Sequence, residues 1–467
     1  MKARFAILFA LFALSFAHVF SVHVRNVFSS AENPDMVAFL RRYGQSPEAA
    51  ERMVPRGEIL DCNGDALSAR AEDGARWARE YPLGEAGVHP VGVFGPRPTG
   101  LERALDAALS SPSPGDPSEG GSVRLSIDGP LQRAAYEALA GRAGAAVAMD
   151  PRSGRIFAAA SSPGYDPLDP SSASGADDGR LVNRAFEGLY PPGSIFKIFT
   201  AAAALEAGED MAIDCPGAGF VPMRGAPPVR DAEYAAYARR GAKWPGFGKI
   251  GMDEAFAHSS NVYFAKLGCG CGKAAFDAMA AKTRLREKCE LAASGRERLL
   301  SAGCGMPPPA NAAELAAASI GQGRLQFTPL AAAMLACAAA NDGAIPAPTL
   351  LADAPARVFS RPFSARTAAR IKTMMRKAVV SGTARGCEIP GLDVCGKTGT
   401  AQTGNGADHS WFVCFAPEEN PQIAVAVVVE NGGFGAEAAL PAAKAILKKA
   451  RERGFVQGSG DAEEDAP

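Results

Sequence analysis

The chain has 467 residues, of which 47% are hydrophobic, 21% are charged and only 7% are aromatic, and its net charge at pH 7 is -1. This length allows two or three domains with a substantial core, and the many alanines favour packed helices over an all-β sandwich or barrel. The near-zero net charge and the lack of a long basic run exclude the usual nucleic-acid-binding surface, so no nucleic-acid partner is expected.

The first predicted element is an apolar stretch at residues 5–24. It contains no Asp, Glu, Lys or Arg, and Lys2 and Arg4 precede it. Its length suits one membrane crossing, and the positive flank predicts that residues 1–4 form a cytoplasmic tip. The alternative is a cleaved signal peptide, because residues 15–17 could serve as a small-residue cleavage site. Since apolar residues continue beyond that point, we expect an uncleaved single-pass anchor in the cell (inner) membrane, with the remaining chain on its outer, periplasmic side.

Residues 25–121 are predicted to form a small first domain that ends in a linker. Within them, residues 56–67 indicate two short strands joined by an Asn-Gly turn. A turn with Gly and Pro then precedes a short amphipathic helix that begins at Leu101. The stretch 110–121 is rich in Pro, Ser and Gly and has no periodicity, which is typical of a linker at a domain boundary.

The next predicted unit, residues 122–453, mixes strands and helices. Strands are expected at 123–127, 145–149, 155–160, 392–403, 410–416 and 422–429. Helices are expected at 131–141, 193–207, 252–268 with a polar break, 312–320, 329–340, 365–380 and 436–453. Because strands lie at both ends and helices in the middle, the two ends should complete one sheet of an α+β domain with an inserted helical subdomain. The remainder, 454–467, should be a disordered acidic tail.

Ser194 and Lys197 lie at the start of the helix expected from residue 193. Two prolines precede them, which suits helix entry, and a spacing of three puts both side chains on one helix face. Apolar neighbours on most sides predict burial, which disfavours a charged ammonium and would let the amine accept the serine proton. Such a pair also arises about twice by chance in a chain of this length, so alone it would indicate only a helix start.

Two further polar clusters fall where no structural reason demands them. Ser259 and Asn261 interrupt the helix expected at 252–268, and Lys397, Thr398, Gly399 and Thr400 lie in the strand expected at 392–403. In chain order, the three clusters give the patterns Ser-x-x-Lys, Ser-x-Asn and Lys-Thr-Gly.

These patterns resemble the motifs of the penicillin-binding proteins, specifically the class B group of monofunctional, membrane-anchored transpeptidases. The resemblance extends over about residues 56–450. It includes the segments IGQG (320–323), TPL (328–330), GKTGTAQ (396–402) and HSWF (409–412). Upstream it includes RGEILDCNGDAL (56–67) and GLE (100–102). Coincidence explains so many ordered matches poorly.

The resemblance implies a transpeptidase domain of the penicillin-binding and β-lactamase-like fold, which is an antiparallel sheet with flanking helices, behind a small pedestal domain at 25–121. It implies a peptidoglycan D,D-transpeptidase that cross-links stem peptides ending in D-Ala-D-Ala through an acyl-serine and is inhibited by β-lactams. No cofactor or metal is implied, and the expected partner is a polytopic membrane glycan polymerase. A carboxypeptidase or β-lactamase would share the motifs, and a β-lactam sensor or a non-catalytic scaffold is the alternative of another class.

By the same resemblance, Ser194 is the nucleophile and Lys197 the base for acylation. Ser259, with Lys397 nearby, would pass a proton to the departing D-alanine nitrogen. Two cations in one pocket would depress the pKa of at least one of them.

The remaining site residues would hold the substrate. Asn261 would bind the peptide amide, Thr398 and Thr400 the terminal carboxylate, and the backbone amides of Ser194 and Thr400 would form the oxyanion hole. Gly399 would admit close approach of the substrate to the strand.

The ten cysteines have no assigned role in this scheme. Cys269 and Cys271 are one residue too close for the usual zinc spacing, which argues against a metal site. Cys387 and Cys395 flank a short loop and could form a disulfide, or both could remain reduced. Cys62 stands where the pedestal element of the family usually has arginine, which puts a local ion pair in doubt. His258 beside Ser259 is expected to be a solvated or capping residue.

Overall fold

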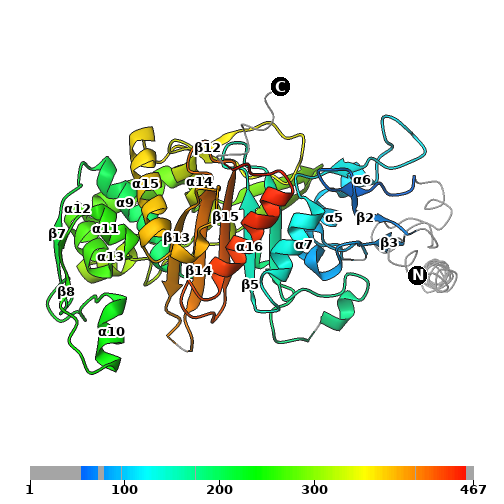
Figure 1. The fold of residues 1–467 in the computed structure, drawn as a ribbon. Coiled ribbons are helices and arrows are strands. Elements are labelled where there is room, and N and C mark those ends of the chain that lie inside the picture. The colour runs from blue at the N-terminus through cyan, green and yellow to red at the C-terminus, as the bar shows by residue number, and fades with distance from the viewer. Residues whose placement is uncertain (1–53, 72–77, 96, 174, 405, 459–467) are drawn as a thin grey trace, which may run out of the picture.

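The computed structural model describes residues 54–71, 78–95, 97–173, 175–404 and 406–458. The expected anchor at 5–24 lies outside these ranges, as do residues 459–467 of the expected tail at 454–467. The start of that tail, residues 454–458, is described, and there Val456 is buried. Within the described ranges, no helix has both the length and the apolar character needed to cross a membrane. Figure 1 shows an elongated molecule, with residues 54–124, here called the N-terminal unit, at one end and the inserted helices at the other.

The central sheet has five strands in the order β13-β14-β15-β5-β6, and all neighbours are antiparallel. The strands are β5 (Gly144–Met149), β6 (Ile156–Ser162), β13 (Cys395–Ala401), β14 (His409–Ala416) and β15 (Ile423–Val429). The prediction that the two ends of the region complete one sheet is confirmed. Every residue of β5 and β15 is buried, as expected for central strands covered on both faces.

Helices cover both faces of this sheet. One face carries α7 (Gly129–Glu137) and α16 (Ala439–Glu452), which pack on each other and on the sheet. The other face carries α14 (Pro329–Ala340) and α8 (Arg184–Glu187). All residues of α14 are buried, and its N-terminus is capped as the sequence predicts, because Thr328 Oγ1 accepts a hydrogen bond from the Ala331 amide.

The inserted helices pack beside the β13 edge of the sheet (Figure 1). They are α9 (Lys197–Glu206), α10 (Ala232–Arg239), α11 (Met252–Ala257), α12 (Asn261–Thr283), α13 (Ala312–Ser319) and α15 (Ala365–Ser381), with the strand pair β7 (Ile213–Pro216) and β8 (Gly246–Ile250). The break expected within 252–268 is confirmed, since residues 258–260 separate α11 from α12. The second helix runs further than predicted and has one non-helical residue, Gly272.

The N-terminal unit contains a four-stranded sheet in the order β3-β2-β1-β4. Its strands are β1 (Ile59–Leu60), β2 (Ala66–Arg70), β3 (Arg79–Glu80) and β4 (Val123–Arg124), and its helices are η1 (Gly84–Ala86), α4 (Val88–Val91), α5 (Gly100–Ala104) and α6 (Asp106–Leu109). The hairpin predicted at 56–67 is confirmed by the pairing of β1 with β2. Strand β4 lies beyond the predicted linker, yet it pairs with β1, so this small sheet includes chain from both sides of the linker.

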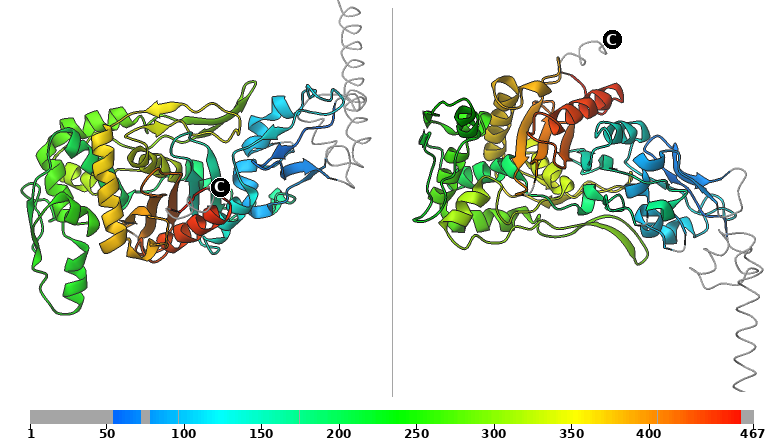
Figure 2. Two further views of the ribbon diagram at one scale, coloured as in Figure 1. Left: turned by 45° about the horizontal axis from the view of Figure 1, so that its top comes forward. Right: turned by 90° about the horizontal axis from the view of Figure 1, so that it is seen from below.

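A hairpin that the sequence did not predict connects the two ends of the molecule. It consists of β9 (Cys289–Ser294) and β10 (Glu297–Ser301), and it contacts α5 and α6 of the N-terminal unit. Both views in Figure 2 show it as a yellow-green arm that extends to the blue unit. The remaining short elements are η2 (Pro170–Ala173), η3 (Gly193–Phe196), η4 (Arg385–Cys387), β11 (Ile345–Pro346) and β12 (Val358–Ser360).

Candidate active site

Ser194 lies on η3, the short helical turn that leads into α9, beside the sheet edge formed by β13. Gly193 has φ 56, a conformation that favours glycine, and a Cβ atom there would lie only 2.4 Å from the carbonyl oxygen of Thr400. The Gly193 amide donates to Gly321 O at 2.9 Å. The absence of side chains at Gly193 and Gly321 therefore lets the turn that carries Ser194 pack closely against β13.

Lys197 meets Ser194 as the spacing predicts. Its Nζ lies 3.0 Å from Ser194 Oγ, and it donates to Ser259 O at 2.6 Å and to Asn261 Oδ1 at 2.8 Å. The Oγ atom of Ser259 is 3.2 Å away. Because the whole Lys197 side chain is buried, its amine is held in one place by the polypeptide.

The same burial changes the acidity of Lys197. Loss of solvation lowers its pKa from 10.5 to about 7, although the negative charges of Asp231 and Glu233 act in the opposite direction. The amine is therefore neutral in a large fraction of molecules near neutral pH. Asp231 is itself buried, where it accepts hydrogen bonds from Ser260 Oγ at 2.9 Å and from the Val262 amide at 3.1 Å.

A second buried lysine contacts Ser259 from the central sheet. Lys397 of β13 has no exposed surface, and its Nζ donates to Ser259 Oγ at 2.9 Å and to Thr398 O at 3.0 Å. Burial lowers its pKa well below the ordinary value, and the nearby charge of Lys197 lowers it further. Ser259 Oγ thus lies between two amines that both have a reduced affinity for protons.

The backbone around Ser259 explains how one residue contacts both lysines. Ser259 has φ 60, which is unusual for a residue other than glycine. Ser259 follows the end of α11, and Ser260 begins α12 by accepting a hydrogen bond from the Tyr263 amide at 3.1 Å. His258 caps the C-terminus of α11, and its half-exposed ring stacks on Phe247. The interpretation of His258 as a solvated or capping residue is therefore confirmed.

The remaining predicted residues follow β13 along the sheet edge. Thr398 Oγ1 lies 2.7 Å from Thr383 Oγ1, and the Thr400 carbonyl accepts a hydrogen bond from Gln322 Nε2 at 3.4 Å. Thr400 Oγ1 accepts from the Gly435 amide at 3.4 Å. The structure therefore brings all eight predicted residues to one end of α9, the start of α12 and the edge of β13.

Gly399 has a steric role within the fold. A Cβ atom at this position would lie 2.8 Å from Trp411 Cβ and 2.9 Å from Ile195 Cγ2. Glycine is therefore required here by the chain's own η3 turn and by the neighbouring strand β14, and the close approach of a substrate at Gly399 stays a prediction.

Three residues at the site have no local signal in the sequence. Thr383 follows the end of α15 and meets β13 only through the fold, and Asp231 begins α10 about 30 positions before the serine cluster that it contacts. Gln322 lies in the IGQG segment, but the resemblance assigned it no role. Conservation among relatives could have marked these three positions, but one sequence does not show conservation.

Metal ligation has little support among the described residues. One group there, Asp61, Cys62 and Asp128, places three possible ligand atoms within 4.8 Å of one another. Asp128, however, accepts hydrogen bonds from Arg453 at 2.8 Å and from Asn63 at 3.0 Å. The arginine therefore supplies the positive charge beside Asp128. All ten cysteines are free, so the suggested bridge between Cys387 and Cys395 does not form.

Comparison with known proteins adds an independent line of evidence. Residues 144–450 match the family model described as the penicillin binding protein transpeptidase domain. The chain belongs to this family. The peptidoglycan D,D-transpeptidase PbpA of Mycolicibacterium smegmatis is 31% identical over 83% of this chain and 87% of its own length. The peptidoglycan D,D-transpeptidase MrdA of Acinetobacter baumannii is 32% identical over 69% of this chain and 53% of its own.

Solved structures agree with this assignment. Penicillin-binding protein A of Mycobacterium tuberculosis, determined as a ceftriaxone acyl-enzyme complex, has a TM-score of 0.76 and 29% identity, covering 86% of this chain and 99% of that one. A D,D-transpeptidase domain from Eggerthella lenta has a TM-score of 0.73 and 33% identity, with coverage of 86% and 99%. The penicillin-binding transpeptidase fold, an α+β fold built on a mixed set of sheets and helices, is thereby established for this chain.

Proposed function

We propose that this protein is a peptidoglycan D,D-transpeptidase that cross-links stem peptides ending in D-Ala-D-Ala through an acyl intermediate on Ser194. The observation that supports this most directly is the buried cluster in which Lys197 Nζ lies 3.0 Å from Ser194 Oγ and Lys397 Nζ lies 2.9 Å from Ser259 Oγ. The relatives named as D,D-transpeptidases and the acyl-enzyme complex of a similar protein support the same reaction and its inhibition by β-lactams.

Acylation begins at the Lys197 amine. A neutral amine has two N–H donors and one lone pair, and the carbonyl oxygens of Ser259 and Asn261 can only accept hydrogen bonds. The two hydrogens therefore point to these oxygens, and the lone pair is left for the hydroxyl of Ser194. Lys197 takes the hydroxyl proton while Ser194 Oγ attacks the carbonyl carbon of the penultimate D-alanine. Backbone amides of Ser194 and Thr400 stabilise the resulting oxyanion.

Collapse of this intermediate needs a proton for the departing amine. Ser259 Oγ, 3.2 Å from Lys197 Nζ and 2.9 Å from Lys397 Nζ, donates its proton to the nitrogen of the terminal D-alanine and is reprotonated by a lysine. The C–N bond breaks, D-alanine leaves, and an ester to Ser194 remains. In the second half-reaction an acceptor amine attacks the ester carbonyl, its proton returns through Lys197 to Ser194 Oγ, and a new peptide bond replaces the ester.

Hydroxyl groups at the sheet edge bind the terminal carboxylate in this scheme. Thr398 and Thr400 are the residues expected from the family. Thr383 joins them, because its Oγ1 is 2.7 Å from that of Thr398. In the free site one of these hydroxyls donates to the other, and when a carboxylate binds beside them both can rotate so that each donates to it. Asn261 already donates from Nδ2 to Arg230 O at 3.0 Å, so its second Nδ2 hydrogen is the one that binds the substrate amide.

Labelling with a fluorescent penicillin tests the nucleophile. The wild-type protein should retain a covalent label, and Ser194→Ala should not; equal labelling of the two would exclude Ser194. Rapid loss of the label from the wild type would instead favour a β-lactamase. Formation of a cross-linked dimer from stem-peptide donor and acceptor would exclude a pure β-lactam sensor or a non-catalytic scaffold.

We also propose that residues 5–24 anchor the protein in the cell membrane by a single pass, that residues 25–121 act as the pedestal with its linker, and that a polytopic glycan polymerase is the partner. The support is the uncharged length of residues 5–24 and the position of the N-terminal unit at one end of the elongated molecule. Co-purification from mild detergent tests the partner. If a chain that begins at residue 122 retains the polymerase as well as the full chain does, residues 25–121 are not the binding surface for the polymerase.

A further inference from the structure

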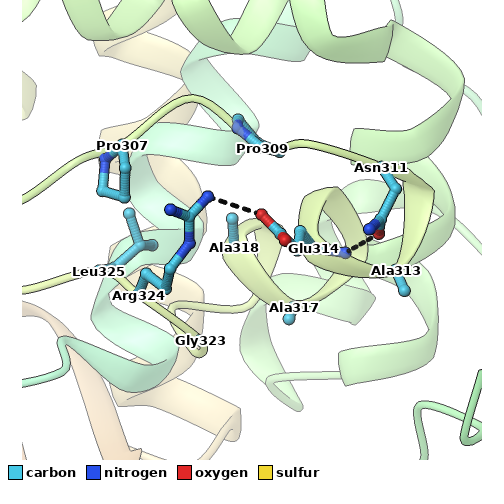
Figure 3. Close-up of a pocket in the computed structure, with 10 residues that line it drawn as sticks. All are labelled: Pro307, Pro309, Asn311, Ala313, Glu314, Ala317, Ala318, Gly323, Arg324 and Leu325. Atoms are coloured by element: carbon cyan, nitrogen blue, oxygen red, sulfur yellow. Dashed lines mark hydrogen bonds and ion pairs between the residues drawn. The ribbon is translucent and has the colours of Figure 1, made fainter.

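A pocket of about 330 Å³ lies next in the chain to residues 321 and 322, which contact Gly193 and Thr400 of the candidate active site. Figure 3 shows the residues that line this pocket. It is enclosed by the proline segment 307–309, the first turns of α13 and residues 323–325. Its walls are mainly apolar and include Pro307, Pro309, Ala317 and Leu325. Small-molecule sites commonly have volumes from about 300 Å³ and apolar walls with a few polar groups, so this pocket suits a short side chain.

One positive and one negative group lie together in this pocket. Arg324 Nη2 donates to Glu314 Oε2 at 2.7 Å and to Pro308 O at 3.3 Å. Among the residues that the structure describes, the other terminal nitrogen of Arg324 and its Nε have no hydrogen-bond partner, and 60% of the side chain is exposed. Hydrogen bonds from the Ala310 amide and from Arg324 lower the pKa of Glu314, so this carboxylate is ionised at neutral pH.

The pocket is connected to the catalytic residues by a short stretch of chain. Gly323 in its wall follows Gly321, which accepts the hydrogen bond of Gly193, and Gln322, which donates to Thr400 O. Neighbouring Cα atoms are about 3.8 Å apart, so Arg324 lies within about three residue lengths of the backbone that adjoins Ser194. A substrate side chain one residue away from the scissile carbonyl can span that distance.

We propose that this pocket binds the side chain of the diamino acid in the donor stem peptide and prefers a diamino acid whose side chain ends in an amine and a carboxylate on one carbon. The inference rests on the proposed transpeptidase function. In the donor, this residue directly precedes the D-alanine that acylates Ser194. Arg324 binds the side-chain carboxylate through its unused donors, Glu314 binds the ammonium group, and the apolar walls cover the methylene groups.

This arrangement distinguishes between donor peptides. A side chain that ends in an amine alone offers no anion to Arg324, and amidation of the carboxylate removes the same charge-assisted pair of hydrogen bonds. Either change should weaken donor binding, whereas the chemistry at Ser194 is untouched. The expected effect is therefore on KM and not on kcat.

The test uses three synthetic pentapeptide donors that differ only at the third residue, which is meso-diaminopimelate, its side-chain amide, or lysine. The acceptor is a single D-amino acid, and released D-alanine is measured with the full-length protein. The wild type should show a KM about tenfold lower for the diaminopimelate donor, and Arg324→Gln should lose that difference. Arg324→Lys, which keeps a charge but not the planar donor pair, should retain part of it.

Arg298→Gln is the matched control, because Arg298 forms a similarly exposed pair with Glu290 on the β9–β10 hairpin, which the pocket does not include. Exposed pairs of this kind add little to stability, so both variants should fold. Equal KM values for the three donors in the wild type would overturn the inference, as would a parallel fall in penicillin acylation in Arg324→Gln. If no donor releases D-alanine and penicillin fails to label Ser194, the proposed function itself is wrong.

Discussion

At the scale of single residues, the proposed mechanism makes the proton affinity of Lys197 decide the pH at which Ser194 can be acylated. The amine must be neutral to accept the Ser194 proton, and burial holds its pKa at about 7. Below that pH the ammonium form predominates and the lone pair is lost. Above it the neutral form predominates and further deprotonation gives no additional base.

The first prediction concerns the pH dependence of acylation. The value of kcat/KM for penicillin acylation should rise about tenfold per pH unit below pH 7 and level off above it, measured by stopped-flow between about pH 5 and 9. The group that titrates is Lys197 in the free protein. A profile that is flat across this range would show that Lys197 is not the base.

The second prediction concerns Thr383, which the sequence did not single out. Thr383→Val removes the hydroxyl that lies 2.7 Å from Thr398 Oγ1 and keeps the shape of the side chain. Because a hydrogen bond to a carboxylate is lost, kcat/KM for donor peptides and penicillin should fall about tenfold or more. The matched control is Thr373→Val on the exposed face of α15, whose hydroxyl donates to Ala369 O within its own helix. An unchanged kcat/KM in Thr383→Val would exclude a role in carboxylate binding.

Some of the site residues could be predicted from the sequence, and others could not. Ser194 and Lys197 were predictable because helical geometry converts a spacing of three into proximity. The same was true of Ser259, Asn261 and Lys397, because their motifs follow that of Ser194 in a recognisable order along the chain. Thr383 and Asp231 were not predictable, because each reaches the site from a separate element and no local pattern links it to its partner.

At the scale of elements, the site depends on how closely the η3 turn packs against β13. Gly193 and Gly321 on one side and Gly399 on the other leave no room for a side chain in this contact. Packing of this kind transmits small shifts, because interiors are as dense as molecular crystals. The position of Ser194 relative to the strand is therefore set by these three glycines.

The third prediction is that Gly193→Ala lowers the rate of acylation and Gly208→Ala does not. The Cβ atom added at position 193 would lie 2.4 Å from Thr400 O, so η3 must move away from β13. A displacement of that order should reduce the acylation rate by about a hundredfold. Gly208→Ala is the control, because Gly208 also has positive φ but has no atom within 4 Å of the added Cβ. Measured by thermal unfolding, Gly208→Ala should cost about 1–2 kcal/mol in backbone strain, and Gly193→Ala should cost about 1–3 kcal/mol more because of the clash.

Elements with strong local signals were predicted well, and those defined by distant contacts were not. The α14 helix was placed because Thr328 and Pro329 form a cap and a first turn that suit helix entry. The hairpin of β9 and β10 was missed because its strands are short and are stabilised against α5 and α6, about 180 residues earlier in the chain. Periodicity reports which face a segment buries but not what covers it.

At the scale of the whole molecule, the N-terminal unit and the transpeptidase domain pack against each other in two places. Elements η1 and α4 contact α7 and β6, and the β9–β10 hairpin packs against α5 and α6. The N-terminal unit is itself built around Glu102, which has no exposed surface and pairs with Arg56 at 2.8 Å and with Arg79 at 3.0 Å. Burial raises the pKa of Glu102, but the two arginines outweigh it and the pKa lies below its ordinary value.

The fourth prediction is that Glu102→Gln destabilises the molecule as one unit. The change leaves the buried guanidinium of Arg79 without its anionic partner and leaves Arg56 paired with Asp106, which should cost about 3–5 kcal/mol. Because the two parts pack against each other through η1 and α4 and through the β9–β10 hairpin, heat-capacity scans should show one transition at a lower temperature, and loss of penicillin binding should follow it. Two transitions, with only the earlier one shifted, would show that the N-terminal unit unfolds alone.

The pH dependence of stability tests the ion pairs of Glu102 in a second way. The stabilisation from ionised Glu102 is present above the pKa of the unfolded carboxyl, 4.5, and is lost as the pH falls through the lower folded value. The stability difference between the wild type and Glu102→Gln should therefore narrow in acid. Glu119→Gln, which breaks the exposed pair with Arg70 in the same unit, should change stability by less than about 1 kcal/mol at any pH. A gap that stays constant into acid would mean that Glu102 acts by packing and not by charge.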